Sequence, residues 1–308
     1  MKVAAVDIGT NTVRLLIAEV VRASGHISIT RAERHEVITR LGEGLDASGR
    51  LGDIPMGRAL AGLDSYAAII DQAGVMYAGG VATEATRSAV NGDTFIAQAA
   101  EVLGFAPRVI DGVEEADLTF RGATNAMPID GSFCVVDVGG GSTEFVVGRG
   151  LPEYAISIDI GSVRLTARAA AMRLTDPAAI RSYVDGLFAP VTPPYAPETI
   201  LGSGGTFVTL GAVAHELSIE DAESRRDVTL SAADLKATVD QLLTMNVAEI
   251  ADLPAVPAAR AGVLKAGAVC AERSLARLEG DAIVVSVADI LDGLALHLAE
   301  ESPAGSFD

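Results

Sequence analysis

The sequence contains the same pattern twice, and this repeat constrains the fold more than any other feature. A short apolar run ends at Asp7, passes through Gly9-Thr10-Asn11-Thr12 and continues as a second apolar run. The segment around Asp137 follows the same order without a gap, 130 positions later, with Gly139-Gly140-Gly141-Ser142 in its turn. Apolar runs joined by a glycine-rich turn predict tight hairpins of buried strands. We therefore expect two similarly built halves that face a shared cleft.

The chemistry of these turns favours an anionic ligand. Glycine leaves the backbone amides bare and permits the conformations that point successive N–H groups one way. The aspartate at the edge of each turn can hold a hard cation through its oxygens. A third turn, Gly202-Ser203-Gly204-Gly205-Thr206, opens an apolar helix, and a helix start is itself an anion site. It is not a P-loop, because no Lys-Ser/Thr follows the glycines.

Composition and charge exclude several classes of protein. The 308 residues are long for one core, and 49% hydrophobic with 21% charged residues describes a globular chain of two domains. A net charge of −18 argues against a nucleic-acid-binding surface, although arginines near the candidate loops can still bind a polyanion. We expect no transmembrane helix, no signal peptide and no zinc site, and hence a cytoplasmic protein with reduced cysteines.

The rest of the pattern alternates strands and helices, which predicts an α/β fold. Helical spacing runs from Pro55 to the glycine stop at Gly74, and a short strand over 75–81 leads into Ala82-Thr83-Glu84-Ala85-Thr86-Arg87. Glu114 and Glu115 stand at a strand-to-helix turn, where acidic residues also occur simply because they suit the helix dipole. The connection near residues 124–132 divides the chain into expected domains 1–126 and 127–308, with the last helix able to pack back on the first domain.

The repeat, the third turn and the alternating elements together resemble the actin, sugar kinase and heat-shock chaperone superfamily. That resemblance implies an α/β fold of two ribonuclease H-like domains with a cleft between them. The order of the motifs is similar to that of one family, the exopolyphosphatase and guanosine pentaphosphate phosphohydrolase (Ppx/GppA) family, in its short two-domain form. The motifs that carry the resemblance are Val6 to Thr12, Arg40-Leu41-Gly42-Glu43-Gly44-Leu45, Thr83 to Arg87, Glu114-Glu115-Ala116, Asp137 to Glu144 and Gly202 to Thr206.

The resemblance implies hydrolysis of a terminal phosphoanhydride, in inorganic polyphosphate or in pppGpp, assisted by Mg²⁺. It assigns Glu115 as the base that activates water. Phosphate-binding positions of the family match Thr10, Asn11, Thr83, Arg87, Gly139, Gly140, Gly141, Ser142, Gly204, Gly205 and Thr206. Metal-binding positions match Asp7, Asp137 and Glu144. A homodimer is also expected from the family, while nucleic acids and membranes are not expected as partners.

Some positions depart from the family pattern. Asp117 stands where many members carry Arg, Arg14 stands where His is common, and Gly262 replaces an Asp. Leu291-Asp292-Gly293 replaces Arg-Glu-Gly, which suggests a sub-branch. Two alternatives to a polyphosphate-preferring hydrolase stay open. One is an ATP-dependent kinase of the same fold, which would need an acceptor, and the other is a non-catalytic polyphosphate- or alarmone-binding protein, which would release no phosphate.

Overall fold

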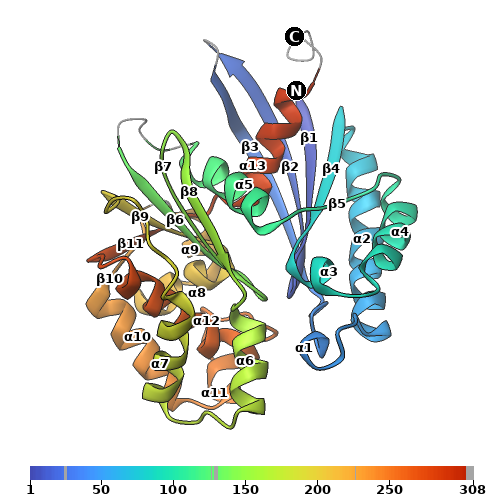
Figure 1. The fold of residues 1–308 in the computed structure, drawn as a ribbon. Coiled ribbons are helices and arrows are strands. Elements are labelled where there is room, and N and C mark those ends of the chain that lie inside the picture. The colour runs from blue at the N-terminus through green and yellow to red at the C-terminus, as the bar shows by residue number, and fades with distance from the viewer. Residues whose placement is uncertain (24–25, 126, 128–130, 226, 303–308) are drawn as a thin grey trace. The chain divides into compact units, whose positions relative to one another are not determined.

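A computed structural model describes residues 1–23, 26–125, 127, 131–225 and 227–302, and these residues form two compact units. Unit 1 comprises Met1–Met127 together with Asp289–Asp308, and unit 2 comprises Pro128–Ala288 (Figure 1). The expected boundary at 126/127 thus lies one residue from the observed one, but the chain from Asp289 onward belongs to unit 1. Residues 126 and 128–130 of the expected connection lie outside the described part of the chain.

Unit 1 is built on a five-stranded sheet in the order β3-β2-β1-β4-β5. Strands β1, β2 and β3 are antiparallel neighbours, whereas β4 runs parallel to β1 and β5 parallel to β4. Its strands are β1 (Lys2–Ile8), β2 (Thr12–Ala23), β3 (His26–Ile38), β4 (Tyr77–Ala82) and β5 (Arg108–Val109). Its helices are α1 (Leu45–Ser48), α2 (Asp53–Ala73), α3 (Glu84–Ser88), α4 (Gly92–Leu103), α5 (Gly112–Thr124) and α13 (Ile290–Glu300).

Unit 2 repeats this topology with one added strand. Its sheet has the order β10-β11-β9-β6-β7-β8, in which β6, β7 and β8 are antiparallel neighbours and β9 runs parallel to β6. Its strands are β6 (Phe133–Val138), β7 (Thr143–Arg149), β8 (Leu151–Ile158), β9 (Thr199–Ser203), β10 (Thr229–Ser231) and β11 (Ala282–Val285). Its helices are α6 (Ser162–Ala171), α7 (Pro177–Phe188), α8 (Gly205–Ala214), α9 (Ile219–Ser224), α10 (Ala232–Thr244), α11 (Val247–Ala251) and α12 (Ala261–Arg277).

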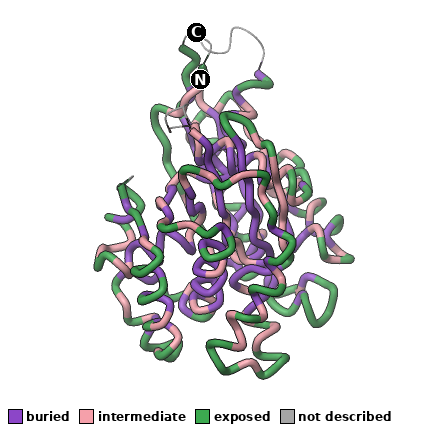
Figure 2. The backbone as a smooth tube through the Cα atoms, turned by 60° about the vertical axis from the view of Figure 1, so that its left-hand side comes forward, coloured by how far each residue is buried: buried purple, intermediate pink, exposed green. Residues whose placement is uncertain are grey.

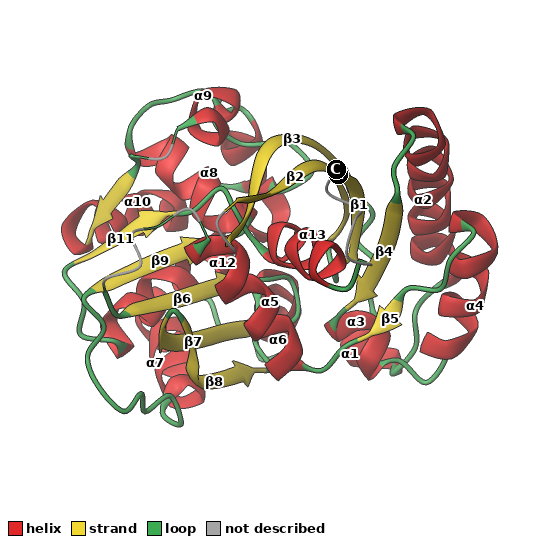
Figure 3. Cartoon of the chain, turned by 90° about the horizontal axis from the view of Figure 1, so that it is seen from above, coloured by secondary structure: helices red, strands yellow, loops and turns green. Residues whose placement is uncertain are grey.

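The strand β1 shows how the sequence pattern positions the site. Side chains alternate between the two faces of a strand. Ala4, Val6 and Ile8 pack into the core formed with α2 and α4, whereas Val3 and Ala5 pack into the core formed with α5 and α13. Figure 3 shows α2 and α13 on opposite sides of this sheet. Asp7 continues the second set and therefore faces α5 and α13. Buried residues are concentrated on the sheet strands, and the outer helix surfaces are exposed (Figure 2).

Several helix ends follow the predicted chemistry. Asp111 caps α5 by accepting from the amides of Val113 and Glu114, and α2 ends at Gly74 in the left-handed conformation. Asn91 precedes α4, but its side chain forms no cap and instead bonds the backbone of Leu51. A loop partner has thus replaced the local bond. Helix α12 begins at Ala261, where Arg260 precedes it without a side-chain cap. Among the described helices, none has the length and apolar character needed to cross a membrane.

Candidate active site

The first glycine turn is supported by the chain that follows β3. The Gly9 amide donates to the Thr12 carbonyl at 2.9 Å, which closes the turn. Segment 39–42 donates three backbone amides to the carbonyls of Thr10 and Asn11, at 2.8 to 2.9 Å. This segment includes the start of the Arg-Leu-Gly motif that the sequence singled out. In this structure the motif therefore acts as a support that fixes the direction of the turn's carbonyl groups.

These bonds also fix the direction of the turn's amides. In a trans peptide the C=O group and the next N–H group point in opposite directions, and the described part of the chain contains no cis peptide. Because the Thr10 and Asn11 carbonyls point toward segment 39–42, the amides of Asn11 and Thr12 point away from it. Two amides aimed to one side form a concave anion site.

The second glycine turn has the same construction, with helix α6 as its support. The Gly139 amide donates to the Ser142 carbonyl at 3.1 Å. The carbonyls of Gly139 and Gly140 accept from the first amides of α6, and the Gly141 carbonyl accepts from the buried guanidinium of Arg164 at 2.7 Å. By the same peptide geometry, the amides of Gly140, Gly141 and Ser142 point away from α6. Three amides thus aim to one side, where an anion can bind.

Gly161, the residue before α6, allows the helix to pack this closely against the turn. A Cβ atom at Gly161 would lie 2.6 Å from the Gly139 oxygen and 2.7 Å from the Gly140 carbonyl carbon, closer than packed atoms approach. The first amides of α6, at Ser162 and Val163, are already bonded to the turn. The anion site of this half is therefore the turn itself and not the start of α6.

The third glycine turn leads into α8. Gly204 has φ +85° and ψ 169°, a conformation that is essentially restricted to glycine. The Thr206 hydroxyl donates to the Val138 carbonyl at 3.0 Å, which ties this turn to the end of β6. The Arg260 guanidinium lies against Gly205, since a Cβ there would be 2.0 Å from an Arg260 amino nitrogen. Both the guanidinium and the positive end of the helix dipole favour an anion at this point.

Next to each hairpin turn, paired polar residues form a row across three neighbouring strands. Directly paired residues of antiparallel strands project to the same face of the sheet. The first polar row is Asp7, Arg14 and Glu36, and the second polar row is Asp137, Glu144 and Ser157. The two rows occupy equivalent positions of the repeat but differ in charge: the middle residue is a guanidinium in unit 1 and a carboxylate in unit 2.

The second polar row suits a divalent cation. Asp137 and Glu144 are directly paired, and two like charges in this arrangement destabilise a sheet unless a cation compensates them. Glu144 is buried and accepts the Ser157 hydroxyl at 2.6 Å. Gly204 leaves room beside Asp137, because a Cβ there would be 2.7 Å from its Oδ1. The described residues contain no cluster of three or more metal-ligating side chains, but Mg²⁺ commonly uses one or two carboxylates plus water and phosphate.

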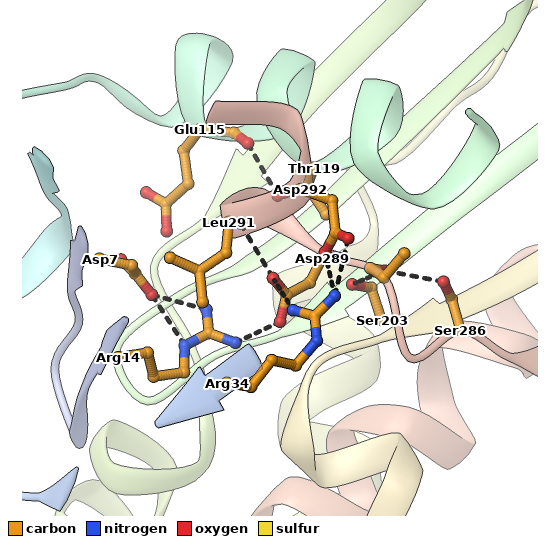
Figure 4. A network of polar contacts seen from close by, with 11 residues as sticks. Asp7, Arg14, Arg34, Glu115, Thr119, Ser203, Ser286, Asp289, Leu291 and Asp292 are labelled. Atoms are coloured by element: carbon orange, nitrogen blue, oxygen red, sulfur yellow. Dashed lines mark hydrogen bonds and ion pairs between the residues drawn. The ribbon is translucent and has the colours of Figure 1, made fainter. Parts of the chain in front are cut away.

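The first polar row contains its own cation. Arg14 donates to Asp7 Oδ2 through Nε at 3.0 Å and through a terminal nitrogen at 2.6 Å (Figure 4). The other terminal nitrogen of Arg14 donates to Asp289. The remaining oxygen, Asp7 Oδ1, is buried without a hydrogen-bond partner among the described residues. Burial raises the pKa of Asp7 even though Arg14 opposes the shift. Asp7 therefore fits a metal ion less well than the Asp137–Glu144 pair.

The start of α13 completes this network. Asp289 caps α13 by accepting from the Leu291 amide, and Asp292 accepts from the Asp289 amide, both at 2.9 Å. Arg34 of β3 donates to both oxygens of Asp292 at 2.7 Å. Burial alone would raise the pKa of Asp289, but Arg14 and Arg34 together lower it. An ionised Asp289 thus holds Arg14 from the side opposite Asp7.

The predicted base lies beside the predicted phosphate-binding arginine. A terminal nitrogen of Arg87 is 3.4 Å from Glu115 Oε2 and also donates to the Ile110 carbonyl at 2.6 Å. The Glu115 side chain is only 14% exposed. Its neighbour Glu114 is 39% exposed and pairs with Arg108 instead. Glu114 is therefore a surface residue whose charge suits the helix dipole at the start of α5. Glu115 is the more buried of the two and is the better candidate for a base.

Thr10 and Thr83 lie at the ends of neighbouring strands. The Thr10 hydroxyl donates to Glu84 Oε2 at 3.3 Å, and Ser88 donates to the other oxygen of Glu84 at 2.7 Å. Glu84 is buried, so this contact ties the first turn to α3. The Thr83 amide donates to the Ile8 carbonyl at 3.1 Å, which places the start of α3 beside the end of β1.

The predicted site residues fall into two groups, one in each unit. Unit 1 holds Asp7, Thr10, Asn11, Thr83, Arg87 and Glu115. Unit 2 holds Asp137, Gly139, Gly140, Gly141, Ser142, Glu144, Gly204, Gly205 and Thr206. Sequence reasoning missed the contacts of Arg14, Glu84, Asp289 and Arg260. Extending the repeat by a few residues would have paired Arg14 with Asp7, but the partners of Asp289 and Arg260 are too distant in sequence for any local pattern.

Comparisons with known proteins identify the family of this chain. The model of the Ppx/GppA phosphatase family matches residues 16–301. Exopolyphosphatase 2 of Mycobacterium tuberculosis is 38% identical over 319 residues, which cover 97% of this chain and 98% of that protein. The crystal structure of an exopolyphosphatase-like protein has 32% identity and a TM-score of 0.84, covering 96% of this chain and 97% of that one.

A third relative extends the agreement to the full fold. The crystal structure of an exopolyphosphatase from Cytophaga hutchinsonii has 27% identity and a TM-score of 0.85, and the match covers 99% of this chain and 100% of that one. The resemblance inferred from the motifs, the fold class of two ribonuclease H-like domains and the assignment to an enzyme family are thereby confirmed. The chain belongs to the Ppx/GppA phosphatase family.

Proposed function

We propose that the protein is an exopolyphosphatase, which hydrolyses the terminal phosphoanhydride of inorganic polyphosphate and releases orthophosphate. The observation that carries this proposal is the Glu115–Arg87 pair, because it places a proton acceptor beside a guanidinium in a largely buried position. The relative from Mycobacterium tuberculosis, named an exopolyphosphatase and similar over nearly the whole chain, supports the same activity. Each of the first two glycine turns directs backbone amides to one side, which suits a phosphate group.

In the proposed reaction, Glu115 accepts a proton from water as the water oxygen attacks the terminal phosphorus. The new P–O bond forms while the bond from that phosphorus to the bridging oxygen breaks, so the products are orthophosphate and a chain shorter by one phosphate. Arg87 stabilises the charge on the transferred group, and the amides of the second glycine turn are suited to bind phosphate oxygens of the substrate. Positioning and electrostatic stabilisation supply most of the rate enhancement in phosphoryl transfer.

A divalent cation forms part of this proposal. Asp137 and Glu144 would hold Mg²⁺, which supplies neutralisation of phosphate charge when bound. A chain with net charge −18 repels a polyanion over long range, so we expect the reaction to depend strongly on the cation. The cytoplasmic location and the homodimer stay predictions, as does the preference for polyphosphate over pppGpp.

The decisive experiment compares two adjacent carboxylates. Purified protein with Mg²⁺ is given polyphosphates of several lengths, pppGpp and ATP, and free phosphate is measured without any acceptor. Glu115→Gln should lower kcat about 10²- to 10⁴-fold, the usual contribution of a positioned base. Glu114→Gln is the matched control and should retain nearly the full kcat, because Glu114 is at the surface and pairs with Arg108.

Each alternative gives a different result. Equal rates for Glu115→Gln and the unmodified protein would contradict the assignment of the base. Phosphate release only when an acceptor is added would identify a kinase, and binding without any release would identify a polyphosphate-binding protein. Faster release from pppGpp than from polyphosphate would move the assignment to the second activity for which the family is named.

A further inference from the structure

The two polar rows differ at one equivalent position, and this difference assigns a role to Arg14. Asp137 is paired across the strands with Glu144, whereas Asp7 is paired with Arg14, and both pairs stand at the end of a glycine-turn hairpin. The position that can receive a metal ion in unit 2 is thus filled by a guanidinium in unit 1. Arg14 is anchored on two sides, since it donates to Asp7 and to Asp289.

Arg14 holds one carboxylate oxygen of Asp7 and leaves the other oxygen available for the reaction. Both donors of Arg14 on this side converge on Oδ2 of Asp7, at 3.0 and 2.6 Å. Oδ1 of the same carboxylate is buried and without a hydrogen-bond partner among the described residues, an arrangement that is unfavourable unless a ligand or water supplies the missing bond. A planar guanidinium that is held at two carboxylates cannot rotate freely, so the carboxylate plane of Asp7 is fixed as well.

Asp289, which holds Arg14, does not need its negative charge to cap α13. Asp289 is the N-cap of α13 and accepts from the Leu291 amide through Oδ1. Asn caps helices as well as Asp does. The negative charge of Asp289 therefore acts on two cations. Its Oδ2 accepts a hydrogen bond from Arg14, and its Oδ1 lies 3.9 Å from the guanidinium of Arg34.

We propose that Arg14, held by Asp289, is a fixed cation that orients the Asp7 carboxylate for the reaction and takes the place of a metal ion in the first polar row. Arg14 and Asp289 are then positioning residues, and Asp7 is not a metal ligand in this protein. The positioning role of Arg14 and Asp289 rests on the proposed function and is tested by kinetics. The statement that Asp7 is not a metal ligand is tested by metal binding.

The kinetic test uses variants that keep the helix cap. Asp289→Asn should lower kcat for polyphosphate about tenfold, less than the hundredfold that a displacement of about 1 Å can cause, with a smaller change in KM. Asp176→Asn is the matched control, because Asp176 caps α7 in the same way and has no part in the site. Its kcat should equal that of the unmodified protein. The kcat of Arg14→Lys should lie between that of Arg14→Gln and that of the unmodified protein, since Lys keeps the charge but not the planar guanidinium.

The order of action follows from combining the changes. If Asp289 acts through Arg14, then Asp289→Asn should cause no further loss of kcat in the Arg14→Gln background. Additive losses in the double variant, or an Asp289→Asn enzyme as active as Asp176→Asn, would overturn the positioning role.

The metal test is independent of activity and uses Mn²⁺ as the probe. Electron paramagnetic resonance counts the ions bound per chain in the absence of substrate. Asp7→Asn should bind as many Mn²⁺ ions as the unmodified protein, and Asp137→Asn should bind fewer. Loss of an ion from Asp7→Asn would overturn the proposal. If the unmodified protein released no phosphate from polyphosphate, the proposed function would fail while the Mn²⁺ count still decided whether Asp7 is a ligand.

Discussion

At the scale of single residues, burial controls the chemistry of the two cysteines. Both thiols are free and fully buried, and burial raises the pKa of Cys134 and of Cys270 from 9.0 to about 12. Because only the thiolate is nucleophilic, the reactive fraction in the native state is roughly a thousandfold smaller than in an exposed thiol. We expect negligible reaction with a thiol reagent at pH 8, and two reacting thiols per chain after unfolding in denaturant.

The same shifts predict how alkali affects stability. The unfolded chain loses its thiol protons near pH 9, whereas the native chain retains them to about pH 12. The contribution of the buried thiols to stability is therefore complete below pH 9 and is lost as the pH rises from 9 to 12. Rapid labelling of either thiol in the native protein at pH 8 would contradict this account.

Inference from sequence can single out residues where the chain repeats a pattern, but it misses contacts whose two partners are remote in sequence. Asp137 and the glycines of its turn are candidate site residues because an equivalent segment stands 130 positions earlier. Glu115 was distinguished from Glu114 only by family resemblance, because adjacent carboxylates carry no signal of which one turns inward. Asp289 and Arg14 are 275 positions apart, and their contact depends on the return of α13 to unit 1, which no local pattern encodes.

At the scale of elements, the contact between α6 and the second glycine turn connects backbone packing to the candidate site. Gly161→Ala places a Cβ 2.6 Å from the Gly139 oxygen, and neither backbone can yield without moving the turn. We expect the free energy of unfolding to fall by about 1–3 kcal/mol, as for other overpacked sites, and KM for polyphosphate to rise because the turn's amides are displaced. Urea unfolding and initial rates measure the two effects.

A second glycine provides the control for this change. Gly186 lies within α7, and a Cβ there meets no atom within 4 Å. Gly186→Ala should leave KM unchanged and stabilise the protein by up to about 1 kcal/mol, the difference in helix propensity between the two residues. A Gly161→Ala protein with unchanged KM would show that the turn binds no substrate.

Element boundaries illustrate a different limit of sequence reasoning. Strong periodicity located α2 to within two residues, since a long helical pattern and a glycine at its C-terminal end agree there. The short elements α1, α3, α9, α11 and β10 were not expected, because three to six residues are too few to show a period. Yet α3 carries Arg87, so part of the site stands on an element that sequence patterns cannot detect.

At the scale of the whole molecule, the chain begins and ends in the same unit. Ile290, Leu291 and Leu294 of α13 are buried with Val3 and Ala5 of β1. Helices α5 and α13 cross in backbone contact, since a Cβ at Gly293 would be 1.8 Å from the Leu118 oxygen and one at Gly122 would be 2.0 Å from the Asp289 oxygen. The core of unit 1 therefore includes a helix that follows all of unit 2 in the sequence.

This arrangement predicts unequal effects of truncation on the two units. Burial of an Ile or Leu side chain contributes about 1.5–3 kcal/mol, so the three large side chains of α13 together approach the 5–15 kcal/mol that stabilises a typical domain. A chain ending at Ala288 should lose hydrogen-exchange protection throughout β1, β2 and α5 while β6, β7 and β9 keep theirs. A chain ending at Ser302 is the control, because it keeps the whole of α13. Equal loss of protection in both units would show that they fold as one cooperative body, and unchanged protection of β1 would show that α13 is dispensable to unit 1.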